Sequence, residues 1–469
     1  MTSEPRVWRF PPPPPTVAST LPVFFFISFA LGLSIIFSRG AFSEPAMWCV
    51  FVALLILVLA LQHVLRTPVR HVTASVYLCA VVWVALLSLL IVALSDRALI
   101  IYPVKPWALG YTALGAWIVL LAGYLPFMVL GLKERPLVRH ARFTLVAAVL
   151  LLGGYDTLKT SPTPWIDVWT VQQAGAGAFL QGKNPYQVVF MRDTGPRQAN
   201  DVPYVYPPTQ IYLTAPSFAL GGDVRWTMLA ALMGTGVLFR FLAQRSGLAL
   251  PGLLEDAPAL FLWFSPKLFF ILEQSWVDPV QLFLITAALS AHVARRKLLT
   301  AVLFGVVASA KQTMFWSVPL VAVLLRFDRR QLLVAAGVAV AAVLPFALWD
   351  FRALKYANLD FLNALPVRPE ALTLTTYVRN HFQVEIPTAV GFLSAAAVVA
   401  LSLWRLPRGA GAFAFAVLAT YFLFFVVNKW AFANYYFLLT GLSGLAAAAS
   451  GHLASQPEEA PASSGAPST

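Results

Sequence analysis

Residues 46–65 have the sequence AMWCVFVALLILVLALQHVL, with no Lys, Arg, Asp or Glu. A helix of this length crosses the roughly 30 Å hydrocarbon core of a bilayer. Comparable runs recur at 72–95, 107–132 and 387–404. Because backbone groups cannot stay unpaired in lipid, only helices or closed barrels span it, and unbroken apolar runs lack the alternation of barrel strands. We therefore expect an all-α, polytopic transmembrane helical bundle.

The composition of the whole chain agrees with this class. Of its 469 residues, 59% are hydrophobic and 11% are charged, whereas soluble domains carry about 25% charged residues. The net charge of +13 comes from basic clusters between apolar runs. Such clusters set membrane orientation and favour anionic lipid headgroups, so membrane lipids are predicted partners and nucleic acid is not. Cys49 and Cys79 fall within predicted spans, and we expect no disulfide between them.

Placing the Lys and Arg clusters in the cytoplasm predicts a cytoplasmic N-terminus and about fourteen helices, two of them short half-helices. The island 159–206 then lies outside, and the proline-containing segment 206–222 is predicted to lie on the outer face as an interfacial helix. A second outer loop is predicted at 350–386. The predicted spans are 20–38, 46–65, 72–95, 107–132, 143–158, 226–244, 257–272, 276–294, two half-helices within 298–325, 331–349, 387–404, 409–427 and 434–451.

Segment 298–325 is predicted to be broken because basic clusters flank both of its ends and Lys311-Gln312 lies in its middle. One continuous span would place one cluster on the wrong side, whereas two half-helices meeting near Lys311 would line a cavity. An ammonium at membrane depth costs several kcal/mol unless it is paired or hydrated. Lys311 is therefore predicted either to bind a phosphate or to pair with a buried acid or with backbone carbonyls.

Polar residues are concentrated in DVWTVQQAGAGAFLQGKNPY (Asp167 to Tyr186) and in YVYPP (Tyr204 to Pro208). Asp167, just past a span, is predicted either to act as a general base toward a hydroxyl or to cap a helix over 168–181. Gly182 is typical of a helix end. The candidate substrate contacts in this region are Lys183 and Asn184 in the turn, and Tyr186, Tyr204 and Tyr206, which would stack on a sugar or anchor at the interface.

Two further groups of polar residues are candidates for a site. Glu273 and Asp278 lie on a short outer loop. They would either hold a divalent metal, the one cofactor that the sequence suggests, or simply end two spans. Arg379 and His381, within TTYVRNHFQ, are candidate contacts for a phosphate or a sugar, as are Lys429 and Asn434.

The spacing of Asp167, Gly182, Asn184-Pro185-Tyr186 and Tyr206-Pro207-Pro208 resembles the first outer loop of GT-C fold glycosyltransferases. The chain is most similar to the bacterial mannosyltransferase-like family that uses polyprenyl-phosphate sugars. The resemblance covers roughly 143–451 and extends loosely to Glu273/Asp278 and the SAKQ segment around Lys311. Two features depart from the family: the four predicted spans in 20–132, and the wide spacing of the second acidic pair.

The resemblance implies an enzyme of the bacterial cytoplasmic (inner) membrane with its active site on the outer face. It would move a hexose or pentose, with mannose favoured, from a polyprenyl monophosphate to a lipid, glycan or protein acceptor. The residue matching Asp167 would be the base, and Lys311 and Arg379 would face the carrier phosphate.

The same resemblance suggests four parts for the chain. They are a proline-rich tail at 1–19, an extra membrane region at 20–132, a catalytic module at 143–451 with outer loop 159–222, and a disordered tail at 452–469. Two other classes stay open. A transporter or lipid flippase would also use broken helices, although the sequence shows no internal repeat. A non-catalytic partner in envelope synthesis would tolerate Asp167→Asn.

Overall fold

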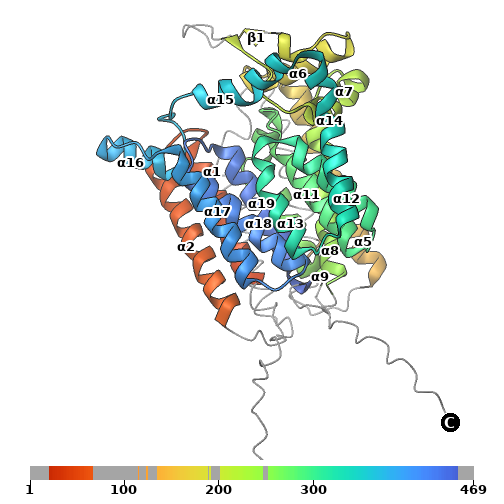
Figure 1. Ribbon diagram of the computed structural model, residues 1–469. Helices are drawn as coiled ribbons and strands as arrows, with labels where there is room; N and C mark the ends of the chain where they lie inside the picture. The colour runs from red at the N-terminus through yellow and green to blue at the C-terminus, as the bar shows by residue number, and fades with distance from the viewer. Residues whose placement is uncertain are drawn as a thin grey trace, which may run out of the picture.

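The computed structural model describes residues 21–66, 115, 123–124, 135–188, 190–191, 201–246 and 252–452. These residues form helices, apart from a small antiparallel pair of strands, β1 (Phe190–Met191) and β2 (Asp201–Val202). The predicted all-α bundle is confirmed (Figure 1). The predicted span 72–95, nearly all of 107–132, the tail 1–19 and the C-terminal tail beyond His452 lie outside the described residues.

The long helices follow the predicted spans closely. Six described helices are long and apolar enough to cross a membrane, which makes the chain a multi-pass membrane protein. These six are α2 (Glu44–Arg66), α5 (Pro136–Thr160), α8 (Arg225–Gln244), α14 (Arg329–Lys355), α17 (Thr388–Arg405) and α18 (Ala410–Val427). Three other helices of the bundle are α1 (Leu21–Ser38), α11 (Asp278–Val293) and α19 (Ala433–Ala449).

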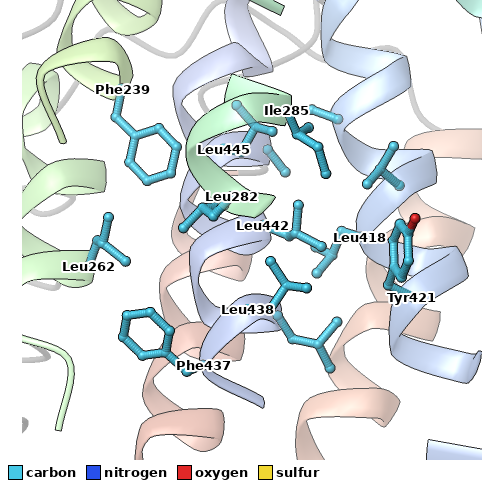
Figure 2. Packing of buried hydrophobic residues seen from close by; sticks show 14 of the residues in the cluster. Phe239, Leu262, Leu282, Ile285, Leu418, Tyr421, Phe437, Leu438, Leu442 and Leu445 are labelled. Carbon is cyan, nitrogen blue, oxygen red and sulfur yellow. The ribbon is translucent and has the colours of Figure 1, made fainter. Parts of the chain in front are cut away.

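The core lies around α18 and α19, which are apolar on all sides. A helix of that kind is buried by its neighbours rather than presented to lipid on one face, and 94% of the apolar stretch of α18 is buried. Figure 2 shows Leu442 of α19 and Leu418 of α18 packing beside Leu282 and Ile285 of α11. By contrast, only 6% of the apolar stretch that begins with α14 is buried in the protein, although α14 packs against α12 (Lys297–Ala310).

The first two helices belong to this same core. α1 packs against α19, and α2 contacts α18. The Ser443 hydroxyl donates to the Phe24 carbonyl oxygen at 2.7 Å, and the Phe24 ring packs edge-on against Phe415. Residues near the N-terminus therefore stabilise helices near the C-terminus. The predicted division of the chain at 20–132 stays a prediction.

The helix break at Lys311 is confirmed. α12 (Lys297–Ala310) ends there, because Lys311 has an extended backbone with φ −153° and ψ 141°. A 3-10 turn, Gln312–Trp316, and α13 (Ser317–Leu324) follow. The predicted continuous span 257–272 is wrong, because this stretch divides into α9 (Gly252–Trp263) and α10 (Leu268–Glu273). Pro266 disfavours helix at the residue before it, and Lys267 takes a left-handed conformation with φ 64°.

One end of the bundle carries short helices and is here called the α6 end (Figure 1). Its elements include α6 (Asp167–Leu180), a 3-10 turn at Pro185–Gln187, and α7 (Pro208–Gly221), which packs against α6, α8, α12 and α14. The predicted helix at 206–222 is therefore present.

Most of the predicted outer loop 350–386 is helical, and its place on the outer face stays a prediction. α14 continues past a kink at Asp350 (φ −161°, ψ 95°), where the Asp350 carboxylate accepts from the Ala353 amide and restarts the helix. A π-helical turn follows at Tyr356–Asp360, where i→i+5 hydrogen bonds replace the α-helical pattern. The remaining helices of this stretch are α15 (Phe361–Ala364) and α16 (Leu374–Phe382).

The opposite end of the bundle contains a buried ion cluster centred on Asp256 of α9. Its carboxylate lies 2.9 Å from Arg240 Nε and 3.6 Å from Arg142 Nη2. It also accepts from the Tyr124 hydroxyl at 2.7 Å. The two arginines come from the end of α8 and the beginning of α5, so the cluster joins three helices.

Candidate functional site

The centre of the candidate site is a buried ion pair at the Lys311 helix break. Lys311 Nζ lies 2.7 Å from Asp278 Oδ1, and Asn434 Nδ2 donates to Asp278 Oδ2 at 2.6 Å. Asp278 is fully buried at the first position of α11, where the helix dipole favours a carboxylate. Lys311 has an extended backbone, so it belongs neither to α12 before it nor to the 3-10 turn after it.

Lys311 was predicted either to bind a phosphate or to pair with a buried group. In the structure it pairs with a buried acid, Asp278. The ammonium also lies 4.6 Å from the centre of the Tyr435 ring, within range of a cation–π interaction. Lys311 keeps 8% of its surface exposed. Any phosphate at this position would therefore meet an ammonium whose charge is already shared with Asp278.

The charges of Asp278 and of Asp167 both reach the phenol of Tyr206. Burial raises the pKa of the Tyr206 hydroxyl well above its usual value, and the charges of Asp167 and Asp278 raise that pKa further. Both carboxylates therefore act on the same phenol, although 111 residues separate Asp167 from Asp278 in the sequence. Lys311, Asp278 and Asn434, which are joined by direct contacts, are here called the acid–lysine site.

Asp167 is the first residue of α6 rather than its cap. The cap position is occupied by Ile166, whose side chain makes no capping hydrogen bond. The Asp167 carboxylate accepts from the Val168 amide at 2.9 Å and is half-buried. A carboxylate is one of the groups that can act as a general base toward a hydroxyl.

The predicted tyrosines pack against one another. The Tyr186 hydroxyl donates to the Tyr206 carbonyl oxygen at 2.6 Å, and Tyr204 is fully buried with rings of Tyr186 and Tyr206 packed edge-on against it. Helix α6 approaches so closely that a Cβ on Gly175 would lie 2.4 Å from the Tyr204 ring. Tyr186 and Tyr204 are therefore core residues, and only Tyr206 of the three is half-exposed. Their roles in sugar binding stay predictions.

The turn after α6 is a helix end, as predicted. Gly182 has φ 72°, and the amides of Gly182 and Lys183 bond back to the carbonyls of Phe179 and Ala178. This is the Schellman arrangement of a helix C-terminus. The Asn184 side chain accepts from the Tyr186 amide and shapes the next turn. Lys183 is exposed.

Arg379 and His381 lie on α16 and have partners in other elements. The Arg379 guanidinium donates to the Val367 carbonyl oxygen at 2.6 Å, and its Nε lies 3.2 Å from Glu385. His381 Nε2 lies 3.1 Å from a carboxylate oxygen of Glu44, at the start of α2. These contacts hold α16 to its surroundings, so the predicted substrate roles of both residues rest on the sequence alone.

Glu273 ends α10 and Asp278 begins α11. This agrees with the alternative prediction that the two acids simply end two spans. Glu273 is fully buried and accepts from Gln274, whereas Asp278 binds Lys311 and Asn434. Among the residues that the structure describes, no group of three His, Cys, Asp or Glu side chains is arranged to hold a metal ion. Metal binding by the pair stays a prediction.

Sequence reasoning did not identify Gln312 and Asn358 as site residues. The Gln312 amide donates to the Val205 carbonyl oxygen at 2.8 Å and to Asn358 Oδ1 at 3.1 Å. Gln312 directly follows the intramembrane lysine, which is a signal that could have identified it. Asn358 lies in the π-helical turn, and no sequence pattern indicated that turn.

Comparison with known proteins gave one fold likeness to report. No family model matches the chain, and no curated protein sequence matches it. The crystal structure of ArnT from Cupriavidus metallidurans bound to undecaprenyl phosphate is similar, with 15% sequence identity and a TM-score of 0.42 over 66% of this chain. The match spans 59% of the ArnT chain. With so low a TM-score, we base no functional argument on the likeness.

Proposed function

We propose that this chain is a GT-C type membrane glycosyltransferase that uses a polyprenyl monophosphate sugar as its donor. The acceptor would be a lipid, glycan or protein hydroxyl, and the α6 end would face the outer side of a bacterial cytoplasmic membrane. The donor sugar is a hexose or pentose, with mannose favoured by the sequence resemblance. The observation that carries the proposal is the buried pair of Lys311 with Asp278 at a helix break, because a charge held at membrane depth is characteristic of a functional site.

In the proposed reaction, the half-buried Asp167 takes the proton of the acceptor hydroxyl. The acceptor oxygen then forms a bond to the anomeric carbon, while the bond from that carbon to the phosphate oxygen breaks. The electron pair of that bond leaves with the polyprenyl phosphate, and a single displacement inverts the configuration. A lipid phosphate is already a good leaving group, so the protein mainly has to position the reactants and balance charge.

Lys311 is the cation paired with Asp278 in the proposed site. A buried ammonium held by Asp278 has a fixed position, and preorganised charge stabilises a developing phosphate charge without reorganisation. The hydrogen bond from Asn434 to the other oxygen of Asp278 keeps that carboxylate from rotating. Asp278 is thus proposed to orient Lys311 rather than to react.

A transporter or flippase is the second candidate, because two helices of the bundle are broken, at Lys267 and at Lys311. Such breaks provide polar backbone at membrane depth in transporters. The two candidates differ in whether the bond between sugar and phosphate is broken. A transporter would move the intact carrier lipid and would not release free polyprenyl phosphate.

The test uses the full chain in lipid nanodiscs with a panel of radiolabelled polyprenyl-phosphate sugars, including decaprenyl-phosphate mannose, and a total bacterial envelope extract as acceptor. We expect release of polyprenyl phosphate together with label in the acceptor fraction. Asp167→Asn should reduce this rate at least about 10²-fold, the usual lower range for general base catalysis.

Asp360→Asn is the matched control, because Asp360 is an exposed carboxylate at the α6 end and is paired with Lys355. Its activity should match the wild type, since an exposed ion pair contributes little. Normal turnover by Asp167→Asn would reject the base assignment. Absence of turnover with every donor of the panel would reject the proposed activity.

A further inference from the structure

Two neighbouring glutamines fasten α6 to two different turns of the bundle. The side-chain amide of Gln172 donates to the carbonyl oxygen of Ser275 at 2.5 Å, in the turn between α10 and α11. The Gln173 side chain bridges the turn between α7 and α8, because it donates to the Gly222 carbonyl oxygen and accepts from the Val224 amide at 3.1 Å. Helix α6 is therefore joined to both turns by side chains that follow each other in the sequence.

Both glutamines bind the carbonyl of a residue with a left-handed backbone. Gly222 has φ 70° and Ser275 has φ 59°. Glycine adopts this conformation without a steric penalty, whereas the Cβ atom of serine then lies too close to the following carbonyl oxygen. The turn at Ser275 is therefore strained, and a strained backbone persists only where its surroundings hold it. The hydrogen bond from Gln172 is a contact that holds this turn.

Gln172 is fully buried, and its amide is only partly satisfied. Its Oε1 atom has no hydrogen-bond partner in the part of the chain that the structure describes. A buried acceptor without a partner destabilises the folded state. An apolar side chain of the same length would avoid that cost but would leave the Ser275 carbonyl without this donor. Glutamine at this position is therefore explained by the hydrogen bond that it donates to the strained turn.

Both residues of this hydrogen bond lie close in sequence to residues of the proposed site. Gln172 follows Asp167 by five residues in the same helix, a rise of about 7.5 Å along a rigid element. Ser275 precedes Asp278 by three residues, and Asp278 begins α11 and binds Lys311. The hydrogen bond therefore joins the helix of the proposed base to the turn that leads into the acid–lysine site.

We propose that Gln172 is a positioning residue, which holds the start of α11 in place relative to the start of α6 by fixing the strained turn at Ser275. The inference rests on the proposed function, in which Asp167 is the base and Lys311 meets the carrier phosphate. Gln172 touches no reacting atom in this scheme. Without its donor the turn relaxes, and Asp278 moves relative to Asp167. A displacement of about 1 Å at a reacting centre can cost roughly 10²-fold in rate.

The first test measures the two turns directly and needs no substrate. Hydrogen–deuterium exchange of the full chain in lipid nanodiscs, read by mass spectrometry, reports how often the backbone amides of each turn open. Gln172→Met keeps the length of the side chain and removes the donor. Exchange in 274–281 should become at least about threefold faster, the weight of one neutral hydrogen bond, and exchange in 222–227 should stay at the wild-type level. Unchanged exchange in 274–281 would overturn the inference.

Gln173→Met is the matched control, because it removes the same kind of side chain at the next position of the same helix. The substitution leaves the Val224 amide without its acceptor. Exchange should therefore become faster in 222–227 and stay unchanged in 274–281, the reverse of the pattern expected for Gln172→Met. If both variants speed exchange in both turns, general loosening of α6 explains the results, and the specific role of Gln172 is refuted.

The second test measures turnover, with the panel donor that the wild type uses fastest. The rate is expressed per binding site for decaprenyl phosphate, so that a smaller folded fraction does not enter the result. Gln172→Met should lower this rate about tenfold or more. The KM for the donor should stay within about threefold of the wild-type value, because Lys311 keeps its charge and its partner Asp278. An unchanged rate per binding site would overturn the positioning role.

A second substitution separates positioning from a general change in stability. Ser275→Gly relieves the strain of the turn, since glycine adopts positive φ readily. Added to Gln172→Met, it should return exchange in 274–281 and the rate per binding site toward the wild-type values. Added to Gln173→Met, it should leave exchange in 222–227 fast, because it does not touch that turn. No recovery in the first pair, or equal recovery in both, would overturn the proposal.

Should Gln172→Met fail to fold, Gln172→Asn carries the same expectations, because its amide is one methylene shorter and cannot reach the Ser275 carbonyl. The proposed function fails on different results, namely normal turnover by Asp167→Asn or no turnover with any donor of the panel. The exchange measurement reports on the turn at Ser275 whatever those results are.

Discussion

Replacing Lys311 by methionine removes the ammonium and keeps a side chain of similar length. The substitution leaves Asp278 fully buried, with Asn434 as its remaining side-chain partner among the contacts described above. The methionine side chain would keep contact with the Tyr435 ring, since a thioether packs well against aromatic edges. The experiment therefore isolates the charge at the helix break with little loss of volume.

The expected magnitude follows from the geometry of the pair. At the Nζ–Oδ1 distance of 2.7 Å, Coulomb attraction is roughly 6 kcal/mol for an effective dielectric constant near 20. Desolvation of the two buried ions offsets most of that attraction, so the intact pair contributes little net stability. Removing one partner is different, because the other charge stays buried, and this costs about 3–5 kcal/mol. Lys311→Met should therefore be strongly destabilising.

A double-mutant cycle in mixed micelles measures this effect by titration with sodium dodecyl sulfate. The variants are Lys311→Met, Asp278→Asn and the two together. The double variant leaves no buried charge at the break and should recover most of the lost free energy of unfolding. The coupling energy should be at least about 2 kcal/mol. Additive effects, with coupling near zero, would refute the view that the pair is energetically a unit.

The same variant also tests the proposed role of Lys311 toward phosphate. Binding of decaprenyl phosphate to the folded protein in nanodiscs should weaken when the ammonium is absent. The Asp278→Asn variant keeps the ammonium without its partner carboxylate and should bind the phosphate at least as tightly as the wild type does. Unchanged affinity in Lys311→Met would show that this lysine serves the fold alone.

Three further predictions concern other parts of the chain. Asp256→Ala should lower the free energy of unfolding by about 3–5 kcal/mol, because it leaves the buried Arg240 without its acid; a loss below about 1 kcal/mol would contradict this. Hydrogen bonds to the Tyr377 carbonyl and to Glu44 raise the pKa of His381, so the contact between α2 and α16 should be complete below about pH 6.5 and weaken as the pH rises through the raised value. Glu44→Gln should reduce that pH dependence, as measured by the mobility of a spin label on α16. Lys183→Cys, at an exposed position, should react with a membrane-impermeant maleimide on intact cells, and reaction only after lysis would invert the proposed orientation.

Several features of the fold could be predicted because they depend on local properties of the sequence. Apolar length predicts spans, and the positions of α8, α11, α17, α18 and α19 agree with the prediction. The break at Lys311 was predicted because a buried ammonium and the flanking basic clusters conflict with one continuous helix. The break at Lys267 was missed, since the prediction weighed the apolar character of 257–272 above the effect of Pro266. The helix beyond Asp350 was missed because polarity alone suggested a loop.

The amino-acid sequence alone thus determined the membrane class, the helix break at Lys311 and the candidate acids, because hydropathy, charge and helix signals act over a few residues. Only the tertiary structure decided which groups meet. Asp278 binds a lysine 33 residues away and an asparagine 156 residues away. Gln312 reaches a carbonyl 107 residues away. Such pairings depend on how the helices pack, and packing is a property of the whole bundle that no local sequence pattern specifies.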